Sequence, residues 1–261
     1  GTHLCLVHKP GFPYKLPESL DAVKQAYIGT LDMADAVRRE VGIDVRVILG
    51  PHPVVWEKQI HTLGIESATQ LHIDSVALAL EHCAEGDAVA LGEVGRPHYP
   101  VSDEIWGAAN EQLETVMHMA SQEGVPIQLH VEDHGAQTNA ELAAICDRSG
   151  LERKRAVHHY APADVSAVFT HGLSSSVSMG KDCLPTLLET HRHCSSTWTM
   201  ETDYLDDLSR PGAVLGPKTV PKRTHALVAS MLELENPEYI AELMHNVQYV
   251  WPSSLYGEFD P

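Results

Sequence analysis

The feature that most constrains this chain is a repeated alternation of short apolar runs with longer amphipathic stretches. Runs rich in valine, isoleucine and leucine predict seven β-strands, at 2–7, 44–50, 88–93, 126–131, 155–160, 173–178 and 196–203. Helical patterns lie between them, near 17–41, 68–84, 102–123, 135–149, 162–170 and 181–192, and two more follow near 218–234 and 237–248. Strands that alternate with helices favour βαβ units and a parallel sheet buried on both faces.

This alternation, together with the length of the chain, predicts a (β/α)8 TIM barrel. The 261 residues match the ~250 residues that are typical of such a barrel. No linker or low-complexity tract divides 1–261, so we expect a single domain. A closed barrel needs eight strands, but the sequence offers seven and begins directly in a strand at Thr2. We therefore expect the first strand of the barrel to lie upstream of Gly1.

Charge and composition narrow the class of function. The net charge of −18 argues against an extended nucleic-acid-binding surface, although a small phosphate site is compatible with it. No apolar run reaches the ~20 residues of a membrane span, and the N-terminus lacks the pattern of a secretory signal. Five widely spaced cysteines without a CxxC pair indicate a reducing compartment, so we expect a cytoplasmic protein.

Polar residues end four of the predicted strands. ALGE ends at Glu93, IQLH at His130, AVHH at His158 and His159, and TMETD at Asp203. Barrel enzymes carry their sites at the C-terminal ends of strands, and a polar group buried there needs a partner. One such residue is more often structural, but four on four strands predict a metal site. These ligand types suit one or two divalent ions, namely Zn²⁺, Mn²⁺, Fe²⁺, Ni²⁺ or a more hydrated Mg²⁺.

Several segments resemble the TatD-related hydrolases, a family of amidohydrolase-like, metal-dependent TIM barrels. Four carry the resemblance in the order of the family, namely LGEVGRPHYP (91–100), PIQLHVED (126–133), AVHHYAP (156–162) and METDYLDD (200–207). ILGPHP (48–53) and HNVQYVW (245–251) are similar to two further motifs. The resemblance covers nearly the whole chain and is strongest to an archaeal-type branch.

The resemblance implies roles for individual residues. Glu93 is similar to the carboxylate that bridges two metals, and His130 and one of His158 and His159 are similar to ligands of the second metal. Asp203 resembles the residue that binds metal and takes a proton from the attacking water. Ungapped matching favours His158, whereas the position at the strand end favours His159. Successive strand residues face opposite sides, so only one of the two points inward.

The sequence departs from the family in two places. The family opens with a strand that ends in HxH, and no HxH lies near this N-terminus. The HxH motif is therefore expected on the same strand that is missing from the barrel. GRPHY stands where the family has GLDY, which places Arg96 and His98 beside the site. Arg96 is either a solvated loop residue or a clamp for a substrate phosphate. His98, and His52 at the end of GPHP, are further candidates for substrate binding.

The function implied by the resemblance is hydrolysis of a phosphodiester, as in deoxyribonucleases of the family. A water activated by metal would attack, with Asp203 as general base. The substrate would be a small-molecule or a nucleic-acid phosphodiester. A small-molecule amidohydrolase or lactonase is the alternative, which the acidity of the chain favours, because related barrels share the fold and the metal ligands. A degenerate barrel that binds without catalysing is a third interpretation.

Overall fold

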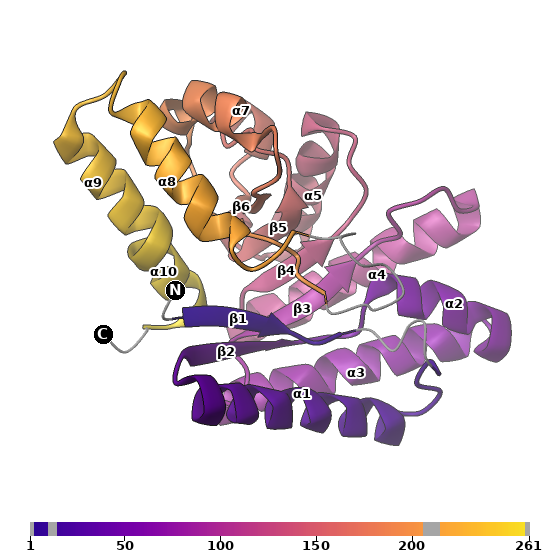
Figure 1. Ribbon diagram of the computed structural model, residues 1–261. Helices are drawn as coiled ribbons and strands as arrows, with labels where there is room; N and C mark the ends of the chain where they lie inside the picture. Colours follow the sequence, from indigo (N-terminus) through magenta and orange to yellow (C-terminus); the bar gives the residue numbers. More distant parts are fainter. Residues whose placement is uncertain (1–2, 10–14, 206–214, 259–261) are drawn as a thin grey trace.

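Seven parallel strands form one curled sheet in the computed structural model, which describes residues 3–9, 15–205 and 215–258 (Figure 1). The strands are β1 (His3–Val7), β2 (Asp44–Leu49), β3 (Ala90–Gly95), β4 (Ile127–His130), β5 (Ala156–Ala161), β6 (Ser174–Ser178) and β7 (Trp198–Glu201). Each pairs with the next in sequence order. The predicted seven-stranded TIM-barrel sheet is therefore confirmed, and β1 and β7 are its edges.

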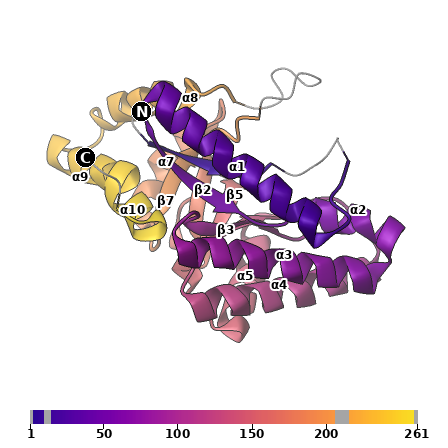
Figure 2. The ribbon, with the colours of Figure 1, turned by 90° about the horizontal axis from the view of Figure 1, so that it is seen from below.

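Helices connect the strands and, apart from the last one, pack along the outside of the sheet (Figures 1 and 2). They are α1 (Leu20–Val41), α2 (Pro53–Leu63), α3 (Ile65–Glu85), α4 (Asp103–Glu123), α5 (Ala136–Ser149), α6 (Ala167–Thr170), α7 (Cys183–Thr190), α8 (Thr219–Met231), α9 (Pro237–His245) and α10 (Trp251–Tyr256). Short 3-10 turns lie at Arg153–Arg155 and His191–His193, and a π-helical turn at Asn246–Val250 joins α9 to α10. Among the described helices, none has both the length and the apolar character needed to cross a bilayer.

Three helices differ from the expectation: α10 lies beyond the predicted helix at 237–248, α6 is shorter than predicted, and α2 is additional. The predicted helix at 162–170 is reduced to the four residues of α6, because Ser166 caps the helix there and accepts from the backbone of Phe169. α2 was not predicted. Its N-cap residue is His52, which is outside the usual set of Ser, Thr, Asp and Asn, so that Pro53 in the first turn was the one available signal.

The alternation of side chains along the strands gives the sheet one apolar face toward the helices and another toward the centre of the curl. One face of the sheet packs against the helices through Val45, Val47, Leu49, Leu91, Ile127, Leu129 and Ala156. On the other face, Ile48, Ala90 and Val157 contact Leu255 and Tyr256 of α10. α10 lies near the start of β1 (Figure 1) and so fills the amino-terminal side of the curl. At the carboxyl ends of the strands, the positions that face the centre of the curl hold polar side chains.

β3 and β4 approach each other closely at Gly95, which is paired with His130. A Cβ atom at Gly95 would lie 2.1 Å from the backbone oxygen of His130, and φ is +149°, a combination open to glycine alone. The register of β3 also shifts between Leu91 and Val94. The backbone around Glu93 is therefore set by the neighbouring strand, and irregularities of this kind commonly re-aim a side chain next to a site.

Buried His72 on α3 predicts that the protein loses stability in acid. Burial lowers the pKa of His72 from its ordinary value of 6.5 to about 3, and Nδ1 has no hydrogen-bond partner among the described residues. The unfolded chain therefore binds a proton near pH 6.5 that the folded chain does not, so the stability is lost as the pH falls below 6.5. Between pH 7 and pH 5 this residue should cost about 2 kcal/mol.

Urea denaturation of the wild type and of His72→Leu at the two pH values measures this contribution. The variant should lose about 2 kcal/mol less than the wild type on acidification. The comparison is made within each protein, so a general destabilisation by the substitution cancels. Equal losses in both proteins would show that His72 is protonated in the folded state.

Candidate metal centre

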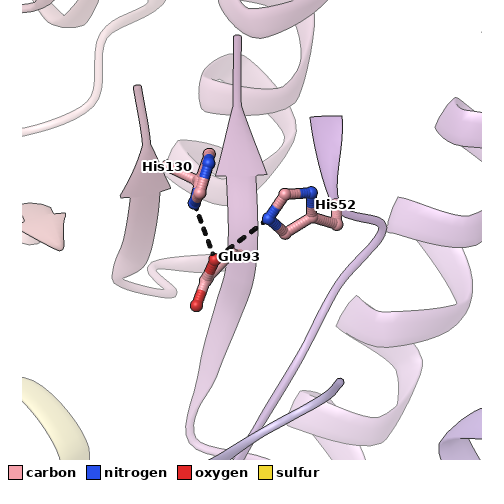
Figure 3. Close-up of side chains that lie close together, drawn as sticks. All are labelled: His52, Glu93 and His130. Atoms are coloured by element: carbon pink, nitrogen blue, oxygen red, sulfur yellow. Dashed lines mark hydrogen bonds and ion pairs between the residues drawn. The ribbon is translucent and has the colours of Figure 1, made fainter. Parts of the chain in front are cut away.

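Imidazole and carboxylate groups converge at the carboxyl ends of the strands, as Figure 3 shows for three of them. Oε2 of Glu93 lies 3.0 Å from Nδ1 of His130 and 3.3 Å from Nε2 of His52. Oε1 of Glu93 lies 3.4 Å from Nε2 of His159, and Oδ1 of Asp203 is 3.8 Å from that same nitrogen. The side chains come from the ends of β2, β3, β4, β5 and β7, so most of the sheet contributes to the cluster.

Glu93 is shared by two groups of possible metal ligands. One group is Glu93 with His52 and His130, the other is Glu93 with His159 and Asp203, and within each the ligand atoms lie within 4.8 Å of one another. The side chain of Glu93 is only 13% exposed. Burial raises the pKa of Glu93, but the nearby imidazoles outweigh it and hold the pKa well below its usual value. The carboxylate is therefore ionised and central, as a bridging ligand requires.

Of the two adjacent histidines of β5, His159 faces the cluster. Its Nδ1 lies 2.9 Å from Oε2 of Glu201, and its Nε2 faces Glu93 and Asp203. Burial lowers the pKa of His159, but the surrounding carboxylates raise it to about 10. This surplus of negative charge is what a cation site needs, and a carboxylate behind a ligating imidazole is the usual way to orient it.

His158 points to the helix side of the sheet. Its Nδ1 lies 2.8 Å from Oδ1 of Asn139 on α5, and burial lowers its pKa to about 4. Val157, its neighbour, packs inward on α10, so the alternation of the strand turns His158 outward. Of the two candidates, His159 lies in the cluster, whereas His158 contacts α5.

Glu201 belongs to the cluster and was not among the predicted residues. Its Oε1 accepts the backbone N–H of Tyr160, and its Oε2 accepts the hydroxyl of Ser176 at 2.8 Å as well as His159. A signal was present, because Glu201 lies two positions before Asp203 in TMETD and strand residues two apart share a face.

Asp203 stands at the open side of the cluster, with 42% of its side chain exposed. Partial burial raises the pKa of its carboxyl to about 6, and Glu93 and Glu201 add to this rise, while His159 opposes it. The backbone at Asp203 is left-handed, with φ of 48°, a conformation that is uncommon for non-glycine residues but that Asp adopts more readily than most. Asp203 is therefore a partly solvent-accessible carboxyl whose pKa is raised to about 6.

Arg96 and His98, the two residues of the altered GRPHY motif, have different places. Nδ1 of His98 lies 2.6 Å from Nε2 of His130, so His98 extends the cluster. Arg96 does not face it as a phosphate clamp, nor is it a solvated loop residue. Its side chain is 1% exposed and pairs with Glu132 and Glu141, with Asn110 and the Trp106 ring beside it. Arg96 ties the ends of β3 and β4 together, because its own N–H also donates to the carbonyl oxygen of His130.

The donor set fits a divalent cation. Glu93, His130, His159 and Asp203 offer two carboxylates and two imidazoles at one edge of the sheet, with a carboxylate between two sets of donors. The curled parallel sheet with these groups at its carboxyl edge defines a metal-dependent hydrolase of the TIM-barrel class. Within this class, a family model described as TatD related DNase matches residues 22–252, and the chain belongs to this family.

Relatives and solved structures agree with this placement. An uncharacterized protein of Methanocaldococcus jannaschii is 31% identical over 229 residues, which cover 87% of this chain and 78% of that protein. A TatD-family hydrolase of Entamoeba histolytica is similar in fold, with a TM-score of 0.61 at 12% identity over 98% of this chain and 84% of that one. A mutant phosphotriesterase-like lactonase of Deinococcus radiodurans has a TM-score of 0.55 at 14% identity, over 98% and 94% of the two chains.

The two histidines of β5 should behave differently when they are removed. His159→Ala should weaken Mn²⁺ binding by more than about 100-fold, beyond the loss expected for an outer hydrogen-bond partner. His158→Ala should leave Mn²⁺ binding unchanged and lower the free energy of unfolding by about 2 kcal/mol, because it leaves Asn139 without its partner. Isothermal titration with Mn²⁺ and urea denaturation measure the two effects. The reverse pattern would assign the inward position to His158.

Arg96→Met should destabilise the protein by about 3 kcal/mol, because Glu132 would stay buried without its cation. The matched control is Arg153→Met, which removes an exposed pair with Asp147 and should cost much less. Urea denaturation of the metal-free proteins measures both. A small loss for Arg96→Met would mean that Glu132 finds another partner or is protonated.

Proposed function

We propose that the protein hydrolyses phosphodiester bonds at the end of a nucleic-acid strand, as a deoxyribonuclease of the TatD-related type. The observation that carries the proposal is the Glu93 carboxylate between two sets of metal-ligand groups, with the Asp203 carboxyl beside one of them. The family match supports the phosphodiester substrate. The acidic chain, with a net charge of −18, favours contact with a strand end over contact along an extended duplex.

Four residues would hold the cation or cations. Glu93 would bridge, His130 would complete one side, and His159 and Asp203 would complete the other. A divalent ion bound there supplies Lewis-acid chemistry, in that it lowers the pKa of water and offsets negative charge on the phosphate oxygens. Glu201 keeps the His159 ring in place through Nδ1, which leaves Nε2 directed at the cation site.

In this proposal Asp203 moves the proton. Its Oδ1 takes a proton from the attacking water as the water oxygen forms a bond to phosphorus. The ester P–O bond then breaks, and the same carboxyl can return the proton to the departing oxygen. In the metal-free protein the pKa of this carboxyl is about 6, so the group is mostly ionised at neutral pH, as a proton acceptor must be.

Hydrolysis of a small lactone is the second candidate. Its support is the strongly acidic chain and the scarcity of cationic groups in the described cluster, since Arg96 is committed to carboxylates. A neutral lactone would meet no repulsion from these carboxylates, whereas an anionic phosphodiester needs the cations to offset it. The two candidates share the site and differ in the charge of the substrate.

Asp203→Asn tests the proposed role of the carboxyl. With Mn²⁺ bound, the variant should hydrolyse bis(p-nitrophenyl) phosphate with kcat lowered by about 100-fold or more, because the amide cannot accept the proton, while KM changes little. Asp32→Asn on the exposed face of α1 is the matched control and should keep full activity. A near-normal kcat in Asp203→Asn would remove this residue from the proton transfer.

The substrate class is tested with the wild type. Single-stranded DNA labelled at one end should be shortened from an end when Mn²⁺ is present, and chelation with EDTA should stop the reaction. Hydrolysis of a lactone panel without any cleavage of DNA would overturn the phosphodiester assignment in favour of the second candidate. No hydrolysis of either class would support a barrel that binds without catalysing.

A further inference from the structure

His52 has two ring nitrogens with different partners, and together they determine its protonation pattern. Nδ1 accepts the backbone N–H of Val54 at 3.1 Å and so caps α2. A backbone N–H is always a donor, so Nδ1 must present its lone pair. The neutral ring then carries its proton on Nε2, the nitrogen that lies 3.3 Å from Oε2 of Glu93 (Figure 3).

This arrangement excludes His52 from acting as a metal ligand while α2 keeps its cap. A ligating imidazole nitrogen needs a free lone pair, but Nε2 of His52 uses its electrons for an N–H bond. His159 shows the opposite arrangement. Its Nδ1 faces the carboxylate of Glu201, which only accepts, so Nδ1 keeps its proton and Nε2 is the nitrogen that can exchange its proton for a cation. The partner of Nδ1 therefore determines whether Nε2 of each histidine can bind a metal.

We propose that His52 is a positioning residue for Glu93, which donates from Nε2 to Oε2 and takes no ligand position on the metal. This inference rests on the metal centre proposed above. The ring is 9% exposed, and its centroid lies 4.2 Å from that of His130. It therefore fills the space beside Glu93 that would otherwise admit water. The His52 ring thus connects the Glu93 carboxylate to the first turn of α2.

Two substitutions of His52 test the roles of Nδ1 and Nε2 separately. His52→Asn places an acceptor oxygen the same number of bonds from Cα as Nδ1, so it should keep the cap but lose the donor to Glu93. His52→Gln places an amide N–H the same number of bonds from Cα as Nε2, so it should keep the donor but lose the cap. His61→Gln, on the exposed side of the same helix, controls for the glutamine substitution.

Co²⁺ serves as the probe, since its absorption spectrum reports the ligands around it. His52→Asn should bind Co²⁺ about 10-fold or more weakly with an unchanged spectrum and stoichiometry, and its metal-free Tm should stay near that of the wild type. His52→Gln should bind Co²⁺ as the wild type does, but its metal-free Tm should fall by about 2–4 °C through loss of the cap. His61→Gln should change neither quantity.

Other outcomes would overturn the proposal. Loss of Co²⁺ stoichiometry and an altered spectrum in both variants would make His52 a ligand. Wild-type affinity in His52→Asn would make it a helix cap alone. If the wild type bound no Co²⁺, the proposed metal centre would fail, and the inference would still be tested by ¹⁵N NMR of the metal-free protein. There Nε2 of His52 should carry the proton, and a proton on Nδ1 would contradict the inference independently of any metal.

Discussion

Glu93 carries a negative charge in a largely buried position, and the arrangement of the strand ends follows from the need to stabilise it. An isolated carboxylate in such a place would be protonated or expelled, because burial costs several kcal/mol. Three imidazoles from β5, β4 and the end of β2 surround it instead. Each belongs to a different strand end, so the charge is stabilised only when the sheet has its native curl. The fold and the site are thus linked through one carboxylate.

The backbone near Glu93 explains how the strands come close enough for these contacts. Gly95 lets β3 approach the carbonyl oxygen of His130, and Arg96, the next residue, pairs with Glu132 just beyond β4. Register shifts occur in β3 beside Glu93 and in β5 beside His159. The shift in β3 accompanies the turn of Glu93 toward the centre of the curl, against the alternation set by Ala90. His159 faces the centre by regular alternation from Val157.

The sequence predicted the strands, their parallel order and most of the cluster, because an apolar run that ends in a polar residue is a local pattern. Three features could not be predicted from the sequence, because they depend on contacts between distant residues or on an unusual cap. The partners of Arg96 lie 36 and 45 residues away, so its burial depends on how α4 and α5 pack. The choice of His159 depends on which face of β5 meets α10. The helix after His52 is capped by an imidazole, which no capping rule anticipates.

The charges of the centre suggest an order to its assembly on the proposed function. Glu93, Glu201 and Asp203 bring three carboxyl groups to one edge of the sheet, and His159 alone faces all three. An anionic phosphodiester that approached these groups would be repelled, and the described cluster holds no free arginine to offset the repulsion. Divalent cations therefore have to be in place before such a substrate binds. The imidazoles and Glu93 favour this prior binding of cations, because their ligand atoms already lie close together in the protein.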